Sequence, residues 1–381
     1  MVAATDAVAA YDRLTERHSR FLRIDELCAR GGDEFPHLLP AKKDLEAEAS
    51  RAQRDKQGHE RRQGEFLAQV MADPEAGAHL CHAMLLPHPK SASLLAEFEK
   101  KGEIQFNGAR LQRQGKAAVL TMSNPRFLNA EDETTLEGME IAVDLALLDP
   151  ETEVCVLRGA PVEHPKYAGK RLFGAGINLT HLYQGKIRYL WYLMRDFGFV
   201  NKFYRGLAFP DASPEVKSVE KLWIAAVEGF AIGGHCQVLL TMDYTIAAQD
   251  AYLTLPARKE GIVPGAANLR LPRFVGDRIT RRAILNELRI DCAGPEGRMI
   301  CDEIVPGSGM DAAIDRIVER LTSSGVVSAA GNRRAIRAGQ EPLDAFRRYM
   351  AVYAREQAYC HLSPALIANL EKNWNAATRR A

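Results

Sequence analysis

The chain has 381 residues, of which 46% are hydrophobic and 7% aromatic, and these proportions are typical of a globular protein with a large apolar core. Fifty Lys and Arg residues against 49 Asp and Glu leave a formal net charge of +1, which argues against nucleic acid or an anionic membrane as the main partner. No run of about eighteen apolar residues occurs, and the seven cysteines are scattered without a C-x-x-C pair. We therefore predict a cytoplasmic protein with no membrane span, disulfide framework or zinc ribbon.

Residues 1–104 are predicted to form an N-terminal helical domain. Residues 42–71 are rich in Ala, Glu, Arg and Gln, carry opposite charges four residues apart and lack proline, which favours a helix. Pro87 and Pro89 interrupt this pattern, and residues 91–101 predict one more short helix.

Residues 105–310 alternate between strand and helix patterns. Short apolar runs predict strands at residues 116–122, 154–157 and 224–227, and apolar residues at helical spacing predict a helix over residues 131–148. This order predicts βαβ units with right-handed crossovers and an α/β core. Further predicted elements are a helical segment at 179–206 and strands at 244–248 and 252–255.

Beyond Leu271 the strand patterns fade. Amphipathic helices are predicted over residues 278–290, 311–323 and 343–378. Residues 311–381 are therefore predicted to form a C-terminal helical region.

Two glycine-containing segments, about sixty residues apart, are the strongest chemical signals. In Leu172-Phe-Gly-Ala-Gly-Ile-Asn178 the glycines flank a small alanine, so the backbone can approach a ligand with no Cβ in the way. In residues 227–236 a strand runs into Gly229, and Gly233 and Gly234 then open a helix. The unpaired N–H groups of such a helix start suit a developing negative charge. Either segment alone is equally consistent with a tight strand-to-helix turn.

Together, the two segments resemble the crotonase (enoyl-CoA hydratase/isomerase) superfamily, and the similarity continues through residues 244–249 and 261–265. The resemblance implies an α/β crotonase core, a ββα spiral, over residues 105–310. It also implies C-terminal helices that assemble the chain into a homotrimer or homohexamer. Carried over residue by residue, Ile177 and Gly234 donate the two backbone N–H groups of an oxyanion hole for an acyl-CoA thioester.

The departures from the hydratase pattern are informative. Hydratases carry one glutamate three residues after the second oxyanion glycine and another after the proline of the Leu-Pro segment, and here these positions are Gln237 and Ala257. Hydration and isomerisation need carboxylates that give and take protons, so both activities are disfavoured. Glu260 lies three residues further on, and we expect a shift of that size to aim its side chain elsewhere.

One branch of the superfamily keeps the oxyanion hole and lacks both glutamates. It comprises the cofactor-independent dioxygenases that act on 3,5-dihydroxyphenylacetyl-CoA in glycopeptide-antibiotic biosynthesis, and the chain resembles it most specifically at residues 176–185 and 193–195. This resemblance implies an acyl-CoA substrate, O2 as co-substrate, neither metal nor cofactor, and release of an arylglyoxylate with free CoA. The sequence defines neither the ring substitution nor the general base.

The resemblance also implies roles for polar residues. Arg195 would hydrogen-bond a ring oxygen or a peroxide, Gln237 would orient the substrate or oxygen, and Glu131 would anchor a ring hydroxyl. Two ordinary alternatives remain open, namely that Glu131 is an acid in the first turn of a helix and that Arg195 is a solvated or interface charge.

Further candidate contacts of the substrate and CoA surround the two glycine segments: Lys170, Arg171, Ala175, Gly176, Asn178, Gly233 and His235. Lys170 and Arg171 are candidates for the CoA phosphates, with a solvated pair at a strand end as the alternative. His235 invites a role as general base. A packing or backbone-bonded histidine is the favoured interpretation, because the motif defines the neighbouring amide and not this ring.

A metal site is disfavoured. His79, Cys81, His82 and His88 are of types that bind zinc, but their spacing is irregular and they lie outside the predicted catalytic core.

Two other function classes remain as alternatives. The first is another arylacyl-CoA crotonase, such as a thioester hydrolase or decarboxylase, which would release CoA without oxygen. The second is a non-catalytic RNA-binding protein of crotonase fold, which the balanced charge disfavours.

Overall fold

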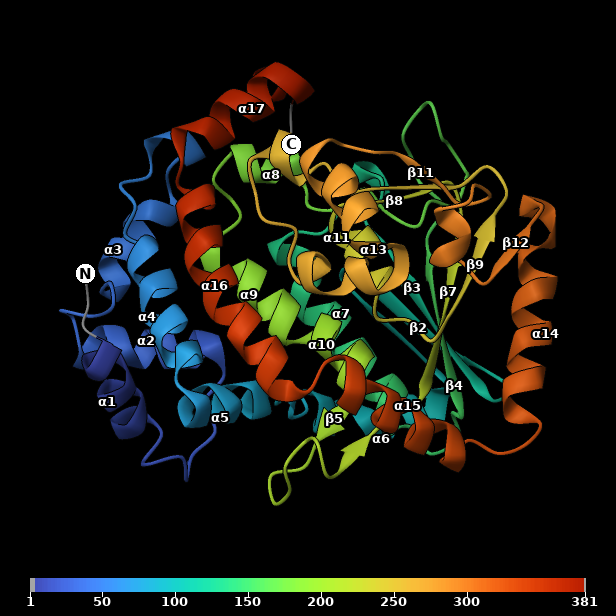
Figure 1. Ribbon diagram of the computed structural model, residues 1–381, viewed down its shortest axis with the longest axis horizontal. Helices are drawn as coiled ribbons and strands as arrows, with labels where there is room; N and C mark the ends of the chain where they lie inside the picture. Colours follow the sequence, from blue (N-terminus) through green and yellow to red (C-terminus); the bar gives the residue numbers. More distant parts are fainter. Residues whose placement is uncertain (1–3, 380–381) are drawn as a thin grey trace.

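The computed structural model describes residues 4–379 and places a layer of N-terminal helices beside a core built on β-sheet (Figure 1). The N-terminal elements are α1 (Ala4–Leu14), α2 (Ile24–Glu34), α3 (Lys42–Ala49), η1 (Gln53–Asp55), α4 (Arg61–Ala72), α5 (Pro74–Leu85) and α6 (Ser91–Lys101). The prediction of a single helix over residues 42–71 is wrong, because a non-helical segment that contains η1 separates α3 from α4. There the buried Glu48 carboxylate accepts the backbone N–H groups of Gly58 at 2.5 Å and His59 at 3.1 Å.

Within residues 4–379 the main sheet has seven strands. In spatial order they are β1 (Glu103–Phe106), β2 (Ala109–Gln114), β3 (Ala117–Met122), β4 (Val154–Gly159), β7 (Leu222–Val227), β9 (Tyr244–Ala248) and β12 (Glu303–Val305). The pairs β1–β2 and β2–β3 are antiparallel, and all pairs from β3 to β12 are parallel. The predicted strands at 116–122, 154–157, 224–227 and 244–248 are confirmed within one or two residues.

A second, smaller sheet turns back from the first. The chain leaves β7 at Gly229, whose φ of +69° favours glycine, and forms β8 (Phe230–Ile232). β8 pairs in parallel with β10 (Tyr252–Thr254), which pairs antiparallel with β11 (Ile290–Asp291). A short hairpin, β5 (Leu207–Ala208) and β6 (Ser218–Val219), projects from the same core.

Helices cover the sheets and define the site. They are α7 (Glu133–Leu148), α8 (Leu179–Tyr183), α9 (Tyr189–Phe197), α10 (Phe199–Arg205), α11 (Gly234–Leu239), α12 (Ala257–Glu260) and α13 (Ala267–Leu285). α7 begins two residues later than predicted, because Asp132 caps it in a capping box with Thr135. The helix predicted at 278–290 belongs to α13, which starts earlier, kinks at Gly276 and ends at Leu285.

The C-terminal region contains α14 (Met310–Thr322), α15 (Val327–Gln340), α16 (Leu343–His361) and α17 (Pro364–Trp374). The helix predicted over residues 343–378 is split, because Pro364 cannot continue α16 and Ser363 caps α17. Short 3-10 turns are η2 (Pro125–Phe127), η3 (Gly297–Met299), η4 (Gly307–Gly309) and η5 (Ala376–Thr378). None of the helices in residues 4–379 is long and apolar enough to cross a membrane.

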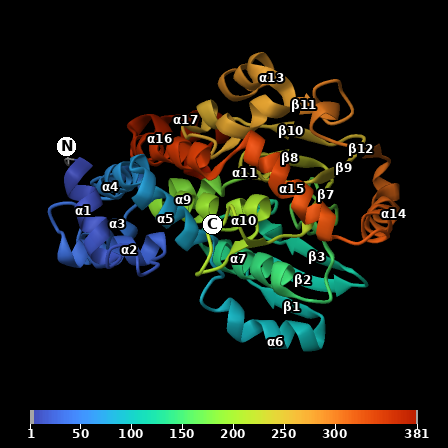
Figure 2. The same ribbon diagram turned by 60° about the horizontal axis from the view of Figure 1, so that its bottom comes forward.

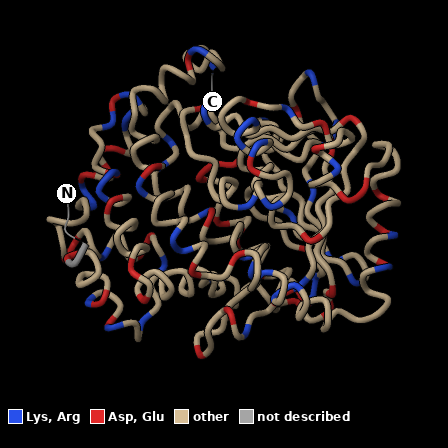
Figure 3. Tube along the Cα trace, viewed as in Figure 1, with Lys and Arg blue, Asp and Glu red and all other residues tan. Residues whose placement is uncertain are grey.

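Apolar packing joins the three regions that the sequence suggested. α6 lies along β1, as Figure 2 shows, and its Phe98 is buried in the core of the main sheet. Helices α1, α2, α4 and α5 share a second core with α9 and α16, and Phe66, Tyr189 and Phe346 are buried in it. Because the regions share these cores, the predicted domain boundaries at residues 104 and 310 remain predictions. Acidic and basic residues are interspersed along the whole trace, in keeping with the balanced charge (Figure 3).

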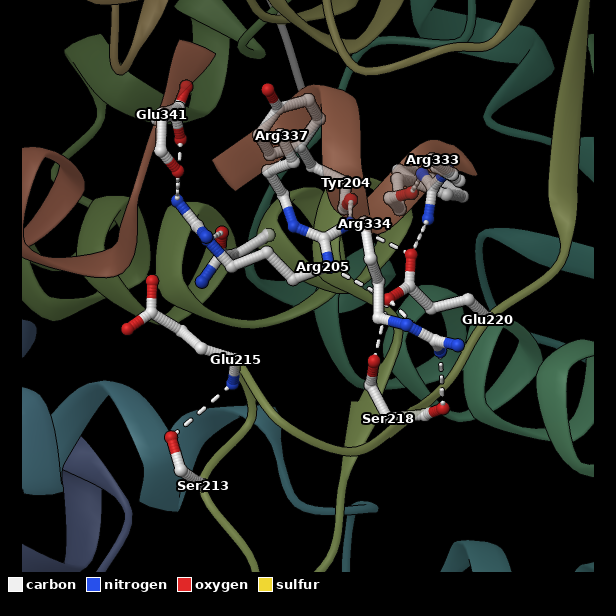
Figure 4. Close-up of polar contacts among 12 residues, drawn as sticks. Tyr204, Arg205, Ser213, Glu215, Ser218, Glu220, Arg333, Arg334, Arg337 and Glu341 are labelled. Carbon is white, nitrogen blue, oxygen red and sulfur yellow. Dashed lines mark hydrogen bonds and ion pairs between the residues drawn. The ribbon is translucent and has the colours of Figure 1, made fainter. Parts of the chain in front are cut away.

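α15 was not predicted, because the side chains that it buries are arginines. Arg333 and Arg337 pair with the buried carboxylate of Glu220 at 2.9 and 2.7 Å (Figure 4). At the end of α15, Glu341 is fully buried and pairs with Arg205 at 3.1 Å and Arg270 at 2.9 Å. These ion pairs attach α15 to α10 and α13, and such a helix has no apolar stripe in its sequence.

Replacing Glu341 by glutamine will destabilise the protein, because it leaves a cluster of buried arginines without their anion. We expect a loss of about 3–5 kcal/mol at pH 7 in urea unfolding. Although burial opposes ionisation, Arg270, Arg205 and Arg273 lower the pKa of Glu341 to about 2. This contribution is therefore full above the ordinary carboxyl pKa and falls as pH drops towards 2.

The matched control is Asp277→Asn, which breaks the exposed pair with Arg281 and should change stability by less than about 1 kcal/mol. Equal effects of the two substitutions would contradict the structural role of Glu341.

Candidate active site

The two glycine segments meet backbone to backbone, as the sequence predicts. Residues 172–178 run alongside β8, with Gly174 N–H donating to the Phe230 carbonyl at 3.0 Å and Ile232 N–H donating back to the Gly174 carbonyl at 3.0 Å. Gly176 has φ +78°, and a β-carbon on it would lie 2.8 Å from the Ile232 carbonyl oxygen and 3.2 Å from Gly234 N. Only glycine permits this approach.

The approach brings together two amides that have no hydrogen-bond acceptor among the described residues, Ile177 N–H and Gly234 N–H. Three amides beside them are bonded: Gly176 N–H donates to His235 Nδ1 at 2.9 Å, Asn178 N–H to the Glu131 carbonyl at 2.8 Å, and Gly233 N–H to the Thr254 carbonyl at 2.8 Å. Ile177 and Gly234 also line one pocket. Two such amides on one wall can hold an oxygen that develops negative charge.

His235 fixes the first amide indirectly. Its ring is fully buried, and Nδ1 accepts the N–H of Gly176 at 2.9 Å. Burial and the nearby Arg195 lower the pKa of His235 to about 3, so the ring stays neutral and Nδ1 remains an acceptor. The favoured interpretation of a backbone-bonded histidine is confirmed, and the ring is placed to orient the Gly176 peptide instead of touching a substrate.

Arg195 on α9 is the centre of a buried polar network. Nε donates to Glu131 at 2.9 Å, Nη1 to Asp196 at 2.8 Å and to Gln237 at 3.1 Å, and Nη2 to the Gly234 carbonyl at 2.8 Å. Only 3% of Arg195 is exposed, so its interpretation as a solvated charge is wrong. The ordinary alternative for Glu131 is also wrong, because this residue precedes the Asp132 cap of α7.

The network leaves specific polar atoms available to a ligand. Burial raises the pKa of Glu131 although Arg195 opposes it, and burial likewise raises the pKa of Asp196. In the described lining of the pocket, three buried atoms have no hydrogen-bond partner, namely Glu131 Oε1, Trp191 Nε1 and Tyr192 Oη. Trp191 was missed from the sequence, where it belongs to an apolar helix pattern.

We call this pocket the inner pocket. Its walls come from α9, α11, α12, the segment Ile262 to Pro264, and Tyr353 of α16. Gln237 and Ala257, the two positions at which hydratases carry glutamates, both lie in these walls.

A larger groove, here called the outer groove, adjoins the inner pocket and shares Ile177 and Glu260 with it. Ala175 and Asn178 line it, and Asn178 also caps α8 by accepting His181 N–H at 3.1 Å. Lys170 and Arg171 are absent from its described lining, and Arg171 instead donates to the Gly159 carbonyl at 3.1 Å. Three other basic residues do line the groove, Arg126, Lys259 and Arg379, and none of them was predicted to contact CoA.

The expectation for Glu260 is wrong. The residue ends α12 and lines both cavities, and its Oε2 lies 4.0 Å from the point where a β-carbon on Gly233 would stand. Only 3% of the residue is exposed, and burial raises its pKa to about 7. The one-turn helix α12 carries the side chain back to the site, which counting positions along the sequence did not reveal.

The histidines of α5 are engaged in packing. His79 Nδ1 contacts the Tyr11 hydroxyl at 2.6 Å, and His82 Nε2 contacts the Phe209 carbonyl at 2.7 Å. Within residues 4–379 no group of three or more His, Cys, Asp or Glu side chains is arranged to hold a metal ion.

Comparison with known proteins places the chain in a family. The enoyl-CoA hydratase/isomerase family profile matches residues 112–357. The (3,5-dihydroxyphenyl)acetyl-CoA 1,2-dioxygenase of Amycolatopsis orientalis is 45% identical over 349 residues, which are 91% of this chain and 80% of that protein. A short-chain-enoyl-CoA hydratase of Clostridium acetobutylicum is 28% identical over 62% of this chain and 84% of that protein.

Solved structures show the same fold at lower identity. An enoyl-CoA hydratase/isomerase from Xanthobacter autotrophicus Py2 matches with a TM-score of 0.59 at 22% identity, over 72% of this chain and 96% of that chain. An enoyl-CoA hydratase from Mycobacterium avium subsp. paratuberculosis K-10 matches with a TM-score of 0.58 at 19% identity, over 73% and 100%. The predicted α/β crotonase fold is confirmed, and the chain belongs to the enoyl-CoA hydratase/isomerase family, the crotonase superfamily.

Proposed function

We propose that the chain is a cofactor- and metal-independent dioxygenase, which converts 3,5-dihydroxyphenylacetyl-CoA and O2 to 3,5-dihydroxyphenylglyoxylate and free CoA. The observation that carries this proposal is the pair of unpaired amides, Ile177 and Gly234, in a pocket where Gln237 and Ala257 replace the hydratase acids. The 45% identity to a dioxygenase of that name supports the choice of substrate and oxidant. Assembly into a homotrimer or homohexamer stays a prediction.

The first chemical step is formation of a thioester enolate. The α-hydrogens of an arylacetyl thioester are acidic, because both the thioester and the ring delocalise the carbanion. As a proton leaves, negative charge develops on the thioester oxygen, which the amides of Ile177 and Gly234 would hold. Each such donor contributes about 3–4 kcal/mol to stabilising the transition state.

The enolate then serves as the electron donor for O2. One electron passes to O2, and recombination of the two radicals forms an α-peroxide. The peroxide attacks the thioester carbonyl and expels CoA, and the O–O bond breaks as the second α-hydrogen leaves. Both atoms of O2 are retained in the arylglyoxylate, and the two α-hydrogens are released as protons, one of which ends on the CoA thiol. The apolar wall at Ile262, Val263 and Pro264 would offer O2 an apolar site.

The polar network would position the dihydroxyphenyl ring. Glu131 Oε1 is the unpaired acceptor for a ring hydroxyl, and the Gln237 amide group can donate, since its Oε1 is occupied by Arg195. Arg195 gives four hydrogen bonds to protein acceptors, so we assign it to holding these two side chains in place. This replaces the direct contact with oxygen that the family resemblance implies.

The outer groove would hold the CoA moiety. Arg126, Lys259 and Arg379 are placed for its phosphates, and aromatic side chains such as Phe230 and Tyr252 line the same groove. Lys170 and Arg171 remain candidates for the outermost phosphate only, since they lie outside the described lining.

Labelled oxygen tests the reaction directly. In metal-free buffer with 18O2, mass spectrometry should find two label atoms in each arylglyoxylate, and CoA release should stop when oxygen is removed. Release of CoA at the same rate without oxygen would indicate a thioester hydrolase or decarboxylase and would refute the proposal.

The ring-anchoring role of Glu131 is tested with two substrates. Glu131→Gln removes a charged acceptor, and we expect kcat/KM for the dihydroxyphenyl substrate to fall about 10- to 100-fold, the equivalent of about 1.5–3 kcal/mol. With phenylacetyl-CoA, which lacks the ring hydroxyls, the same substitution should change kcat/KM less than about threefold.

An equal loss on both substrates would assign Glu131 to general support of the site. Thermal unfolding of the variant serves as the control, because Glu131 also pairs with the buried Arg195.

A further inference from the structure

We propose that Glu260 is the general base, which takes the α-proton of the arylacetyl-CoA as the oxyanion hole receives the enolate oxygen. The inference rests on the proposed function and identifies the group that the sequence left undefined. It is carried by the position of the side chain relative to the two cavities and the two amides.

The first observation is that Glu260 stands at the junction of the two cavities. Among the described residues, only Ile177 and Glu260 line both the inner pocket and the outer groove. A thioester with its aryl group inside and its CoA outside must pass this junction, and the amide of Ile177 fixes the thioester oxygen there. The α-carbon is bonded to the carbonyl carbon, so it lies beside the same junction and within reach of the Glu260 carboxylate.

The second observation is that the carboxylate is buried without a compensating charge. No Lys, Arg or His of residues 4–379 forms an ion pair with Glu260, whereas Glu131 and Asp196 share Arg195. Burial alone raises the pKa of Glu260 to about 7. A base with this pKa is ionised in a large fraction of molecules near neutral pH and is basic enough to take an activated α-proton.

The other titratable groups facing Glu260 are poorly suited to this role. Tyr192 of α9 and Tyr353 of α16 line the inner pocket, and burial raises their pKa well above 10, so they stay neutral. On the groove side, Lys259 and Glu287 face each other at 3.8 Å. His235, which is adjacent to Gly234, has its Nδ1 occupied by Gly176 N–H.

The proton transfer is balanced within the site. The Cα–H bond breaks and its electron pair becomes the carbon–carbon double bond of the enolate, while the carbonyl π electrons move onto the thioester oxygen. The proton resides on Glu260, and the negative charge moves from the carboxylate to the oxygen held by Ile177 and Gly234. No oxidant is needed until O2 enters.

The test is hydrogen exchange at the α-carbon without oxygen. The substrate is incubated anaerobically with the full-length protein in D2O, and deuterium incorporation is followed by NMR, with O2 uptake measured separately. We expect Glu260→Gln, which is nearly isosteric, to slow exchange and O2 uptake by about 10²- to 10⁴-fold. Glu260→Asp should retain part of both rates, and formate should restore part of the exchange in Glu260→Ala.

The pH dependence of the exchange rate distinguishes a general base from a residue with a purely structural role. In the unmodified chain, the exchange rate should rise with pH through about 7, because Glu260 must lose its proton to act. Glu260→Gln should lack this rise while its melting temperature and its binding of an unreactive thioether analogue are maintained. Glu319→Gln, an exposed substitution on α14, is the matched control and should leave both rates unchanged.

The outcomes separate the two proposals. Exchange at the normal rate in Glu260→Gln, with the normal pH profile, would overturn the assignment of Glu260 while the dioxygenase stands. Exchange in the unmodified chain without O2 uptake would refute the dioxygenase, and the effect of Glu260→Gln on exchange would still decide the role of Glu260.

Discussion

The close backbone approach of two glycine-containing loops is the constraint on which the site depends. A β-carbon on Gly176 would lie 2.8 Å from the Ile232 carbonyl oxygen, and one on Gly234 would lie 2.6 Å from Glu131 Oε2 and 2.9 Å from Arg195 Nη2. The amides of Gly176, Asn178 and Gly233 are bonded, whereas Ile177 N–H and Gly234 N–H have no acceptor among residues 4–379. Leaving two amides without partners is unfavourable for folding, and it is tolerated where they bind a ligand oxygen.

Electrostatics around this pair of amides divide the pocket into regions of different chemistry. The buried cation Arg195 forms ion pairs with both Glu131 and Asp196, so these charged side chains lie together in one part of the pocket. Glu260 has no cation and stands at the entrance to the groove, where burial keeps its pKa near neutrality. The remaining wall, around Ile262, is apolar and suits O2. Carboxyls in different surroundings can thus be an anchor and a base within one pocket.

The sequence predicted what is local and patterned. Buried strands such as Ala117–Met122 and the glycine segments were predicted correctly, because an apolar run indicates a buried strand and glycines indicate a tight turn. α15 was missed because it buries Arg333 and Arg337 in ion pairs, and β1 because it is a half-exposed edge strand. Glu260 was misplaced for a similar reason. Its position is set by how α12 turns between two cavities, which depends on tertiary structure and has no signature in residue spacing.

The same fold and the same amides can therefore support different outcomes, depending on what surrounds the enolate. Gln237 and Ala257 stand where hydratases carry the carboxylates of a hydration, and in the proposed reaction O2 is the partner that consumes the enolate. The central claim is that Ile177 and Gly234 polarise the thioester carbonyl. Infrared spectroscopy of carbonyl-labelled substrate, bound without oxygen, measures this directly. We predict a carbonyl stretching frequency below that of the free thioester in buffer, and an unshifted frequency in the bound substrate would contradict the account.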